Sequence, residues 1–192
     1  KIIKILKSSG TSGSDPSKIF LDSFNSKNQT WVLSKIVENI IGKKRLPMLI
    51  VDQDPQGVNR SSYNARIAAI NGFSIFGKSI TYMLDKNNKV DIKQLNNFVK
   101  KFGNKKFLIF GFTNLIFEHF LESKLKLLKK KNLKNAIIIH GGGWKKLEHK
   151  SIGNKVFKKN LKLNKNINKV YNYYGLIEQT GSIFIECPSC SC

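Results

Sequence analysis

Short apolar runs and stretches with helical periodicity alternate along the chain. The apolar runs predict strands at residues 2–6, 18–21, 48–51, 107–112, 136–139, 170–173 and 183–185. Apolar residues that recur every three or four positions predict helices at residues 29–41, 60–70, 91–102, 114–130 and 151–163, with stop signals at Gly42, Asn71-Gly72 and Gly103. Continuous apolar strands separated by amphipathic helices are typical of βαβ units. We therefore predict an α/β fold with a mainly parallel sheet flanked by helices.

Three loops of unusual composition follow predicted strands. They cover residues 8–13, 140–144 and 174–178. Parallel sheets bind ligands at the carboxyl ends of their strands, in the loops that come next. The chemistry of the protein is therefore expected in these three loops.

The first loop has a composition that suits anion binding. It consists of Ser8, Ser9, Gly10, Thr11, Ser12 and Gly13. Glycines permit left-handed backbone, so successive N–H groups can converge on an anion while the hydroxyls add further donors. A polyphosphate is the ligand that this composition suits, and a flexible surface linker is the alternative.

The second loop, His140-Gly141-Gly142-Gly143-Trp144, follows a run of isoleucines. Three glycines would let a flat ligand lie against the backbone, and Trp144 could form a wall of the site. A tight turn between buried elements is the alternative. The His-Gly-Gly-Gly string also occurs in the oxyanion loop of esterases, but the chain has no Gly-x-Ser-x-Gly elbow to supply a nucleophile.

The third loop combines an aromatic ring, an amide and a carboxylate. Tyr174 could stack on a base, Asn172 could read the edge of that base, and Glu178 could hold Mg²⁺ beside a triphosphate. A Tyr174-Gly175 pair at a strand end can equally serve packing alone.

In this order, the three loops resemble the phosphate loop, adenine-side turn and magnesium motif of the adenylate-forming ligases. Residues 140–146 and 174–184, with the run from Pro47 to Asp52, look most like the acyl-protein synthetases. These are the long-chain fatty acid to luciferin-component ligases of bacterial bioluminescence, together with relatives in surface-polysaccharide pathways. The resemblance covers nearly the whole chain. It implies part of the large domain of such a ligase.

The resemblance also implies an activity. A fatty acid or other small carboxylate would be activated with ATP and Mg²⁺ to an acyl-adenylate and passed to a thiol of an acyl-accepting protein, such as an acyl reductase. Ser8, Ser9, Thr11 and Ser12 would hold the β and γ phosphates, Gly142 and Gly143 would flank adenine, and Glu178 would bind Mg²⁺. Ile177 departs from the superfamily, which usually has Thr there. No later ribose-binding Asp or catalytic Lys is found, so we expect residues 1–192 to be an ATP-binding core truncated at both ends.

Composition refines this picture. A chain of 192 residues with 41% hydrophobic residues can bury one substantial core. The net charge of +22 would suit nucleic acid, but the excess is nearly all Lys spread along the chain, which favours solvated faces over a reading surface. A basic nucleic-acid-binding domain is kept as an alternative only. No segment is apolar enough for a signal peptide or membrane span, so a cytoplasmic location is expected.

The three cysteines, Cys187, Cys190 and Cys192, lie within the last six residues. Such a cluster cannot form a distributed disulfide framework. It could contribute to a structural Zn²⁺ site, which needs four ligands, and free thiols are the alternative.

The segment from Gly72 to Ser79 matches the Gly-x-x-x-x-Gly-Lys-Ser string of P-loop nucleotide triphosphatases, the other alternative function. A P-loop needs a strand before it and a helix starting at its Lys. Here a helix is predicted before it and a strand at residues 80–83 after it. We therefore expect Lys78 at the surface or sheet edge, and Phe73, Ile75 and Phe76 in the core or an acyl pocket.

Overall fold

A computed structural model of the chain describes residues 2–7, 18–56, 65–123, 125, 133–175 and 183–187. Its centre is a sheet in the order β4-β3-β5-β6-β7-β8. The strands are β3 (Leu46–Val51), β4 (Gly77–Tyr82), β5 (Phe107–Phe112), β6 (Ala136–Gly141), β7 (Lys169–Tyr174) and β8 (Phe184–Ile185). Every neighbouring pair is parallel except β7 and β8. The predicted α/β fold with a mainly parallel sheet is confirmed.

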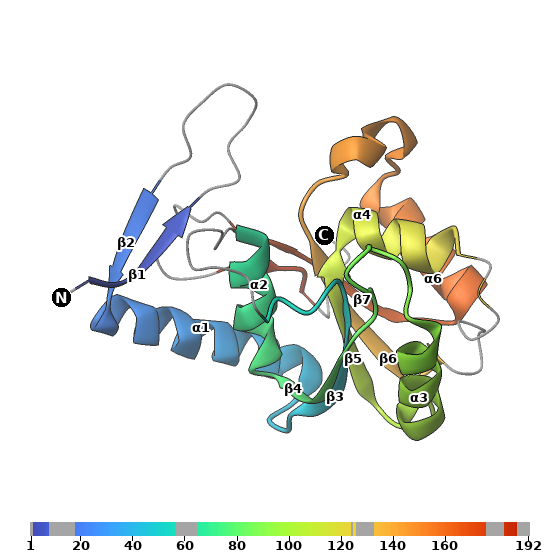
Figure 1. Cartoon of the computed structure of the whole chain (residues 1–192), viewed down its shortest axis with the longest axis horizontal. Helices are drawn as coiled ribbons and strands as arrows, with labels where there is room; N and C mark the ends of the chain where they lie inside the picture. Colours follow the sequence, from blue (N-terminus) through green and yellow to red (C-terminus); the bar gives the residue numbers. More distant parts are fainter. Residues whose placement is uncertain are drawn as a thin grey trace.

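Helices cover both faces of this sheet (Figure 1). On one face lie α1 (Ser23–Ile41) and α2 (Ala65–Ser74). On the other lie α3 (Ile92–Phe102), α4 (Thr113–Ile116) with the π-helix η2 (Phe117–Leu121), and α6 (Asn154–Lys165). Because all residues of β5 and β6 are buried, these strands need a helix layer on each side. A short 3₁₀ helix, η4 (Lys145–Lys150), follows β6 and was not predicted.

Polar caps set two helix starts. Asp22 accepts the Asn25 N–H at 2.8 Å, so α1 begins at Ser23, six residues before the predicted start. Asp91 accepts the Gln94 N–H at 3.0 Å and starts α3 as predicted. Gly42, with φ of +85°, ends α1 as predicted. None of the described helices is long and apolar enough to cross a membrane.

Two predicted helix ends are wrong. α2 continues through Asn71 and Gly72 to Ser74, because Phe73 is buried to 2% exposure. Burying that ring contributes about 1.5–3 kcal/mol, which exceeds the cost of about 1 kcal/mol for glycine in a helix. The helix predicted at 114–130 instead ends at Leu121 after a π turn, in which Glu122 N–H donates to the Phe117 carbonyl at 3.0 Å.

The first two strands form a separate sheet. β1 (Ile2–Lys7) pairs antiparallel with β2 (Lys18–Asp22), and Figure 1 shows this pair standing away from the central sheet. The expectation that residues 8–13 follow a strand of the central sheet is therefore wrong. Two strands of one hairpin pair locally and need no partner in the larger sheet. Ser8 to Gly13 themselves lie outside the described residues.

The P-loop alternative is also wrong. Gly72 and Phe73 belong to α2, and Gly77 to Ser79 belong to β4, so a helix leads into a strand where a P-loop would need the reverse. Lys78 is exposed on β4, the edge strand, as predicted. Phe73 and Phe76 are core residues as predicted, but Ile75 is 39% exposed because it lies in the turn between α2 and β4.

Replacing Phe73 and Lys78 in turn tests this assignment. We expect Phe73→Ala to lower the free energy of unfolding by about 3–5 kcal/mol, because it removes a ring that stacks on Phe110 at 4.4 Å. Lys78→Ala should change it by less than about 0.5 kcal/mol. Urea denaturation followed by circular dichroism measures both. A large loss from Lys78→Ala would mean that the exposed edge position is misassigned.

Candidate functional site

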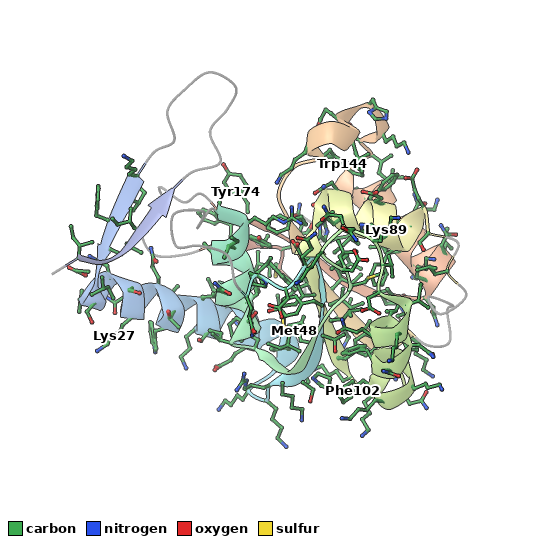
Figure 2. The ribbon with its side chains drawn as sticks, in the orientation of Figure 1. Lys27, Met48, Lys89, Phe102, Trp144 and Tyr174 are labelled. Carbon is green, nitrogen blue, oxygen red and sulfur yellow. The ribbon has the colours of Figure 1, made fainter. Side chains whose placement is uncertain are left out.

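The second and third predicted loops meet at one edge of the sheet. β6 and β7 are parallel neighbours, with His140 opposite Asn172 and Gly141 opposite Tyr173. The turn at Gly142 and the segment ending in Tyr174-Gly175 therefore leave adjacent strands at the same level. In Figure 2, Tyr174 and Trp144 lie at the upper end of the molecule, and Phe102 at the lower end. These two motifs form the candidate site.

The three glycines of the turn have different surroundings. A Cβ at Gly141 would lie 2.6 Å from both the ring and the carbonyl oxygen of Tyr173, so this position needs glycine for packing. Gly142 has φ of +76°, a left-handed backbone that favours glycine. A Cβ at Gly143 would meet nothing within 4 Å. Of these three glycines, only Gly143 borders open space, which a ligand could occupy.

The two tyrosines at the end of β7 point to opposite faces. Tyr173 is buried, and its ring stacks on Phe110 with a centroid distance of 6.1 Å. Burial raises the pKa of the Tyr173 hydroxyl well above its ordinary value. Tyr174 is 60% exposed, so its ring is free to stack on a ligand. The structure thus separates a packing tyrosine from an exposed tyrosine within one motif.

Glu186, which the sequence did not single out, fixes the backbone of Asn172. Its carboxylate accepts the Asn172 N–H at 2.6 Å and pairs with the Lys158 ammonium at 2.7 Å. It also accepts a hydrogen bond from the Asn154 side chain. Burial raises the pKa of Glu186, but the hydrogen bonds from Asn172 and Lys158 outweigh it and leave the pKa below its usual value. This carboxylate ties β7 to the start of α6.

Trp144 is anchored away from the glycine turn. Its ring makes edge contacts with Phe117 at 5.0 Å and Phe157 at 6.1 Å between centroids. These contacts place it against η2 and α6. The indole therefore packs in the helix layer formed by η2 and α6.

His140 is a buried structural group. It is 1% exposed, and its Nδ1 lies 3.0 Å from the Thr113 hydroxyl, which donates to the Gly141 carbonyl at 3.1 Å. Among the described residues no partner is found for its Nε2. Burial lowers its pKa from 6.5 to about 4, so the ring is neutral at pH 7. This burial also argues against the esterase reading of the His-Gly-Gly-Gly string.

Asp52 and Arg66 form a second polar feature that sequence reasoning missed. Asp52 directly follows β3 and is 2% exposed. Arg66 of α2 donates Nε to one of its carboxylate oxygens at 2.7 Å and Nη2 to the other at 2.5 Å. A carboxylate immediately after a fully apolar strand was the available signal, because such a group needs a partner when buried.

Several predicted site residues lie outside the described part of the chain. These are Ser8, Ser9, Gly10, Thr11, Ser12, Gly13, Glu178, Cys190 and Cys192. Cys187 is described and exposed. Among the described residues, no group of three or more His, Cys, Asp or Glu side chains could hold a metal ion.

Solved structures show the class of protein that has this fold. ATP-bound MatB from Rhodopseudomonas palustris matches 92% of this chain with a TM-score of 0.56 and 15% sequence identity. An ATP-bound chimera, RpMatB-BxBclM B3, matches equally well, and apo MatB matches with a TM-score of 0.54 and 14% identity. MatB is an adenylate-forming ligase, so the chain has the fold of that class. The chain spans 29% of the length of these proteins.

The sequence itself shows the family. The model of the acyl-protein synthetases, LuxE, matches residues 1–190, and the chain therefore belongs to the acyl-protein synthetase family. The resemblance noted in the sequence is confirmed, and the family is one of ligases. No curated protein sequence matches the chain.

Substituting Gly141 and Gly143 separates packing from open space. Gly141→Ala should lower the free energy of unfolding by about 2 kcal/mol or more, because its methyl group would strike the Tyr173 backbone, which cannot move aside without breaking the sheet. Gly143→Ala is the matched control and should be tolerated within about 0.5 kcal/mol. Urea unfolding of both variants checks this. Equal losses would contradict the assigned packing.

Buried His140 should make stability depend on pH. Its pKa is lower in the folded state, so between about pH 6.5 and 4 the unfolded chain binds more protons, and stability falls as the pH falls. One such group lowers the free energy of unfolding by up to roughly 3 kcal/mol as the pH falls across this window. His119, whose pKa burial also lowers, contributes in the same direction. Urea unfolding at several pH values should therefore give a shallower dependence for His140→Gln than for the unmodified chain. Identical slopes would show that His140 does not titrate as described.

Proposed function

We propose that this chain is the nucleotide-binding part of a ligase that activates a carboxylic acid with ATP and passes the acyl group to a thiol. The observation that carries the proposal is the meeting of the Gly141–Gly143 turn with Asn172 and Tyr174 on neighbouring strands. Membership of the acyl-protein synthetase family supports it. The ATP bound to MatB, whose fold this chain shares, supports ATP as the nucleotide.

The described residues fit a nucleobase. Open space above Gly143 leaves room for a flat ring, and the exposed Tyr174 supplies a face for stacking. In this proposal the backbone at Gly142 and Gly143 flanks adenine, Tyr174 and Gly175 form the opposite side, and the Asn172 amide contacts the base edge. Glu186 supports this arrangement because it fixes the backbone of Asn172.

The phosphate and metal contacts are proposed from the sequence. Ser8, Ser9, Thr11 and Ser12, with Gly10 and Gly13, would bind the β and γ phosphates, and Glu178 would bind Mg²⁺. Carboxylate oxygen is a ligand that Mg²⁺ prefers beside phosphates. When bound, Mg²⁺ would neutralise charge on the triphosphate. The cysteine cluster 187–192 could bind Zn²⁺, and we assign it no part in the reaction.

The reaction joins two anions and then transfers an acyl group. A carboxylate oxygen attacks the α-phosphorus of ATP, the bond to the bridging oxygen breaks, and pyrophosphate leaves. A thiolate then attacks the acyl carbon, and AMP leaves with the electron pair of the broken bond. The first step depends on positioning and charge neutralisation, which a site of backbone donors and fixed cations supplies.

The family suggests the carboxylic acid substrate and the acyl acceptor. We infer a long-chain fatty acid as the carboxylic acid and a protein, such as an acyl reductase, as the acceptor. We also infer that the enzyme acts in the cytoplasm, where ATP is available. The long acyl chain would need an apolar channel.

Exchange of radiolabelled pyrophosphate into ATP, dependent on a fatty acid and measured in the complete ligase that contains this chain, tests the proposal. Glu178→Gln keeps the size of the side chain but removes its charge, so we expect exchange to fall at least about a hundredfold while the chain stays folded. Glu148→Gln, at an exposed position on η4, is the matched control and should retain exchange. Exchange that survives Glu178→Gln would reject the role of Glu178. Absence of exchange by the complete ligase with every fatty acid tried would reject the proposed function.

A further inference from the structure

Lys145 has an unusual backbone conformation. Its φ is +51°, in the left-handed region that residues with a long side chain rarely adopt. Two of the other three described residues of this kind, apart from glycines, are asparagines, which tolerate it well. Lys145 stands two residues after Gly143, at the start of η4. Strained residues of this kind cluster at functional sites, where the strain directs a side chain.

The Lys145 ammonium lies over an aromatic ring at the edge of the candidate site. Its Nζ lies 5.4 Å from the centre of the Phe112 ring. Phe112 is the last residue of β5 and lies opposite Gly141 in the register of the sheet. The ring holds the cation by a cation–π contact, and none of the ion pairs found among the described residues involves Lys145. The ammonium can therefore still bind an anion.

Arg66 is held at the end of β3, the strand on the other side of β5 from β6. Val51 of β3 lies opposite Gly111 of β5, so Asp52 comes level with Phe112. Asp52 occupies Nε and Nη2 of the Arg66 guanidinium, whose side chain is 37% exposed. The remaining N–H donors stay available, in an orientation that the bidentate pair fixes. Asp52, the partner of Arg66, directly follows β3, and Lys145 follows β6. Because one strand separates β3 from β6, the ends of these two strands lie about 10 Å apart.

We propose that Lys145 and Arg66 form an oxyanion-binding site across the carboxyl end of β5, above Phe112. The inference rests on the proposed function and adds two residues to it. The ligand is a carboxylate or a phosphate monoanion, which the proposed reaction supplies as the carboxylate of the acid and the α-phosphate of ATP. These two anions repel one another as they approach. The Lys145 cation and the remaining Arg66 N–H donors, held at the point of contact, offset that repulsion.

The position of Lys145 argues that it binds an anion and is not merely a solvated surface charge. The site lies at the carboxyl edge of the parallel sheet, next to the Gly141–Gly143 turn. Asp52 and Arg66 form an ion pair with little net charge, so Arg66 contributes hydrogen-bond donors, and Lys145 supplies the positive charge that no described ion pair uses. Lys101 provides the contrast, because its Nζ also lies over an aromatic ring, Phe102, at 5.3 Å, but at the end of α3. Phe102 lies at the lower end of the molecule in Figure 2, away from the turn.

Calorimetric titration of the 192-residue chain tests the proposal with two probes, AMP for the phosphate and dodecanoate for the carboxylate. Lys145→Gln should weaken binding of one or both by about tenfold or more, because it removes a charged hydrogen bond. Lys145→Arg should stay within about threefold, since it keeps the charge. Lys101→Gln is the matched control and should change neither.

The pattern of losses identifies the anion. Loss of AMP affinity alone assigns the site to the α-phosphate, and loss of dodecanoate affinity alone assigns it to the carboxylate. If the unmodified chain binds the probes and Lys145→Gln binds both equally well, the oxyanion site is rejected while the proposed function stands. If the unmodified chain binds neither probe, the proposed function fails, and this inference falls with it.

A glycine at position 145 separates binding from folding. Lys145→Gly removes the cation but relieves the left-handed strain, so the melting temperature should rise or stay unchanged while affinity for the same probe falls. A merely structural lysine would give the opposite result, with a lower melting temperature and unchanged affinity. That outcome would overturn the proposal.

Discussion

Burial of β5 and β6 on both faces is the constraint on which the rest of the structure depends. Every residue of these strands is buried, so their backbone groups must pair with neighbouring strands and both faces must be covered by helices. Parallel pairing with β3 and β7 meets the first need, and the two helix layers meet the second. Because four parallel strands then end together, the residues that follow them form one continuous edge. The candidate site is a direct consequence of this arrangement.

Close packing at that edge divides the residues of each motif between structure and ligand. Tyr173 fills the space beside Gly141, and its ring joins the aromatic cluster with Phe73 and Phe110. This contact fixes the direction of the backbone. Gly143, two residues after Gly141, and Tyr174, one residue after Tyr173, are exposed to solvent. The three glycines of the motif therefore have three different roles. One glycine permits contact, one permits a turn, and one leaves space.

Scarce acidic residues are used to hold elements together. The chain has 12 Asp and Glu against 34 Lys and Arg. Asp52 joins β3 to α2 through Arg66, and Glu186 joins β7 to α6 through Lys158 and Asn172. Removing Arg66 would be the costlier change, because it would leave the buried Asp52 carboxylate without compensation. The remaining cations far outnumber the acids.

Periodicity and composition by themselves determined most strands of the central sheet and the start of α3 at Asp91. Local signals suffice there, because burial on two faces and a helix cap depend on residues that are neighbours in the sequence. The resemblance of the motifs pointed to the acyl-protein synthetase family. The sequence did not determine where α2 ends, since burial of Phe73 overrides Gly72, or that β1 lies outside the central sheet. It also could not reveal the Asp52–Arg66 pair, 14 residues apart, or the Thr113–His140 contact, 27 residues apart. Strand order and register are set by pairing between distant segments, and only the tertiary structure decides which polar groups then meet.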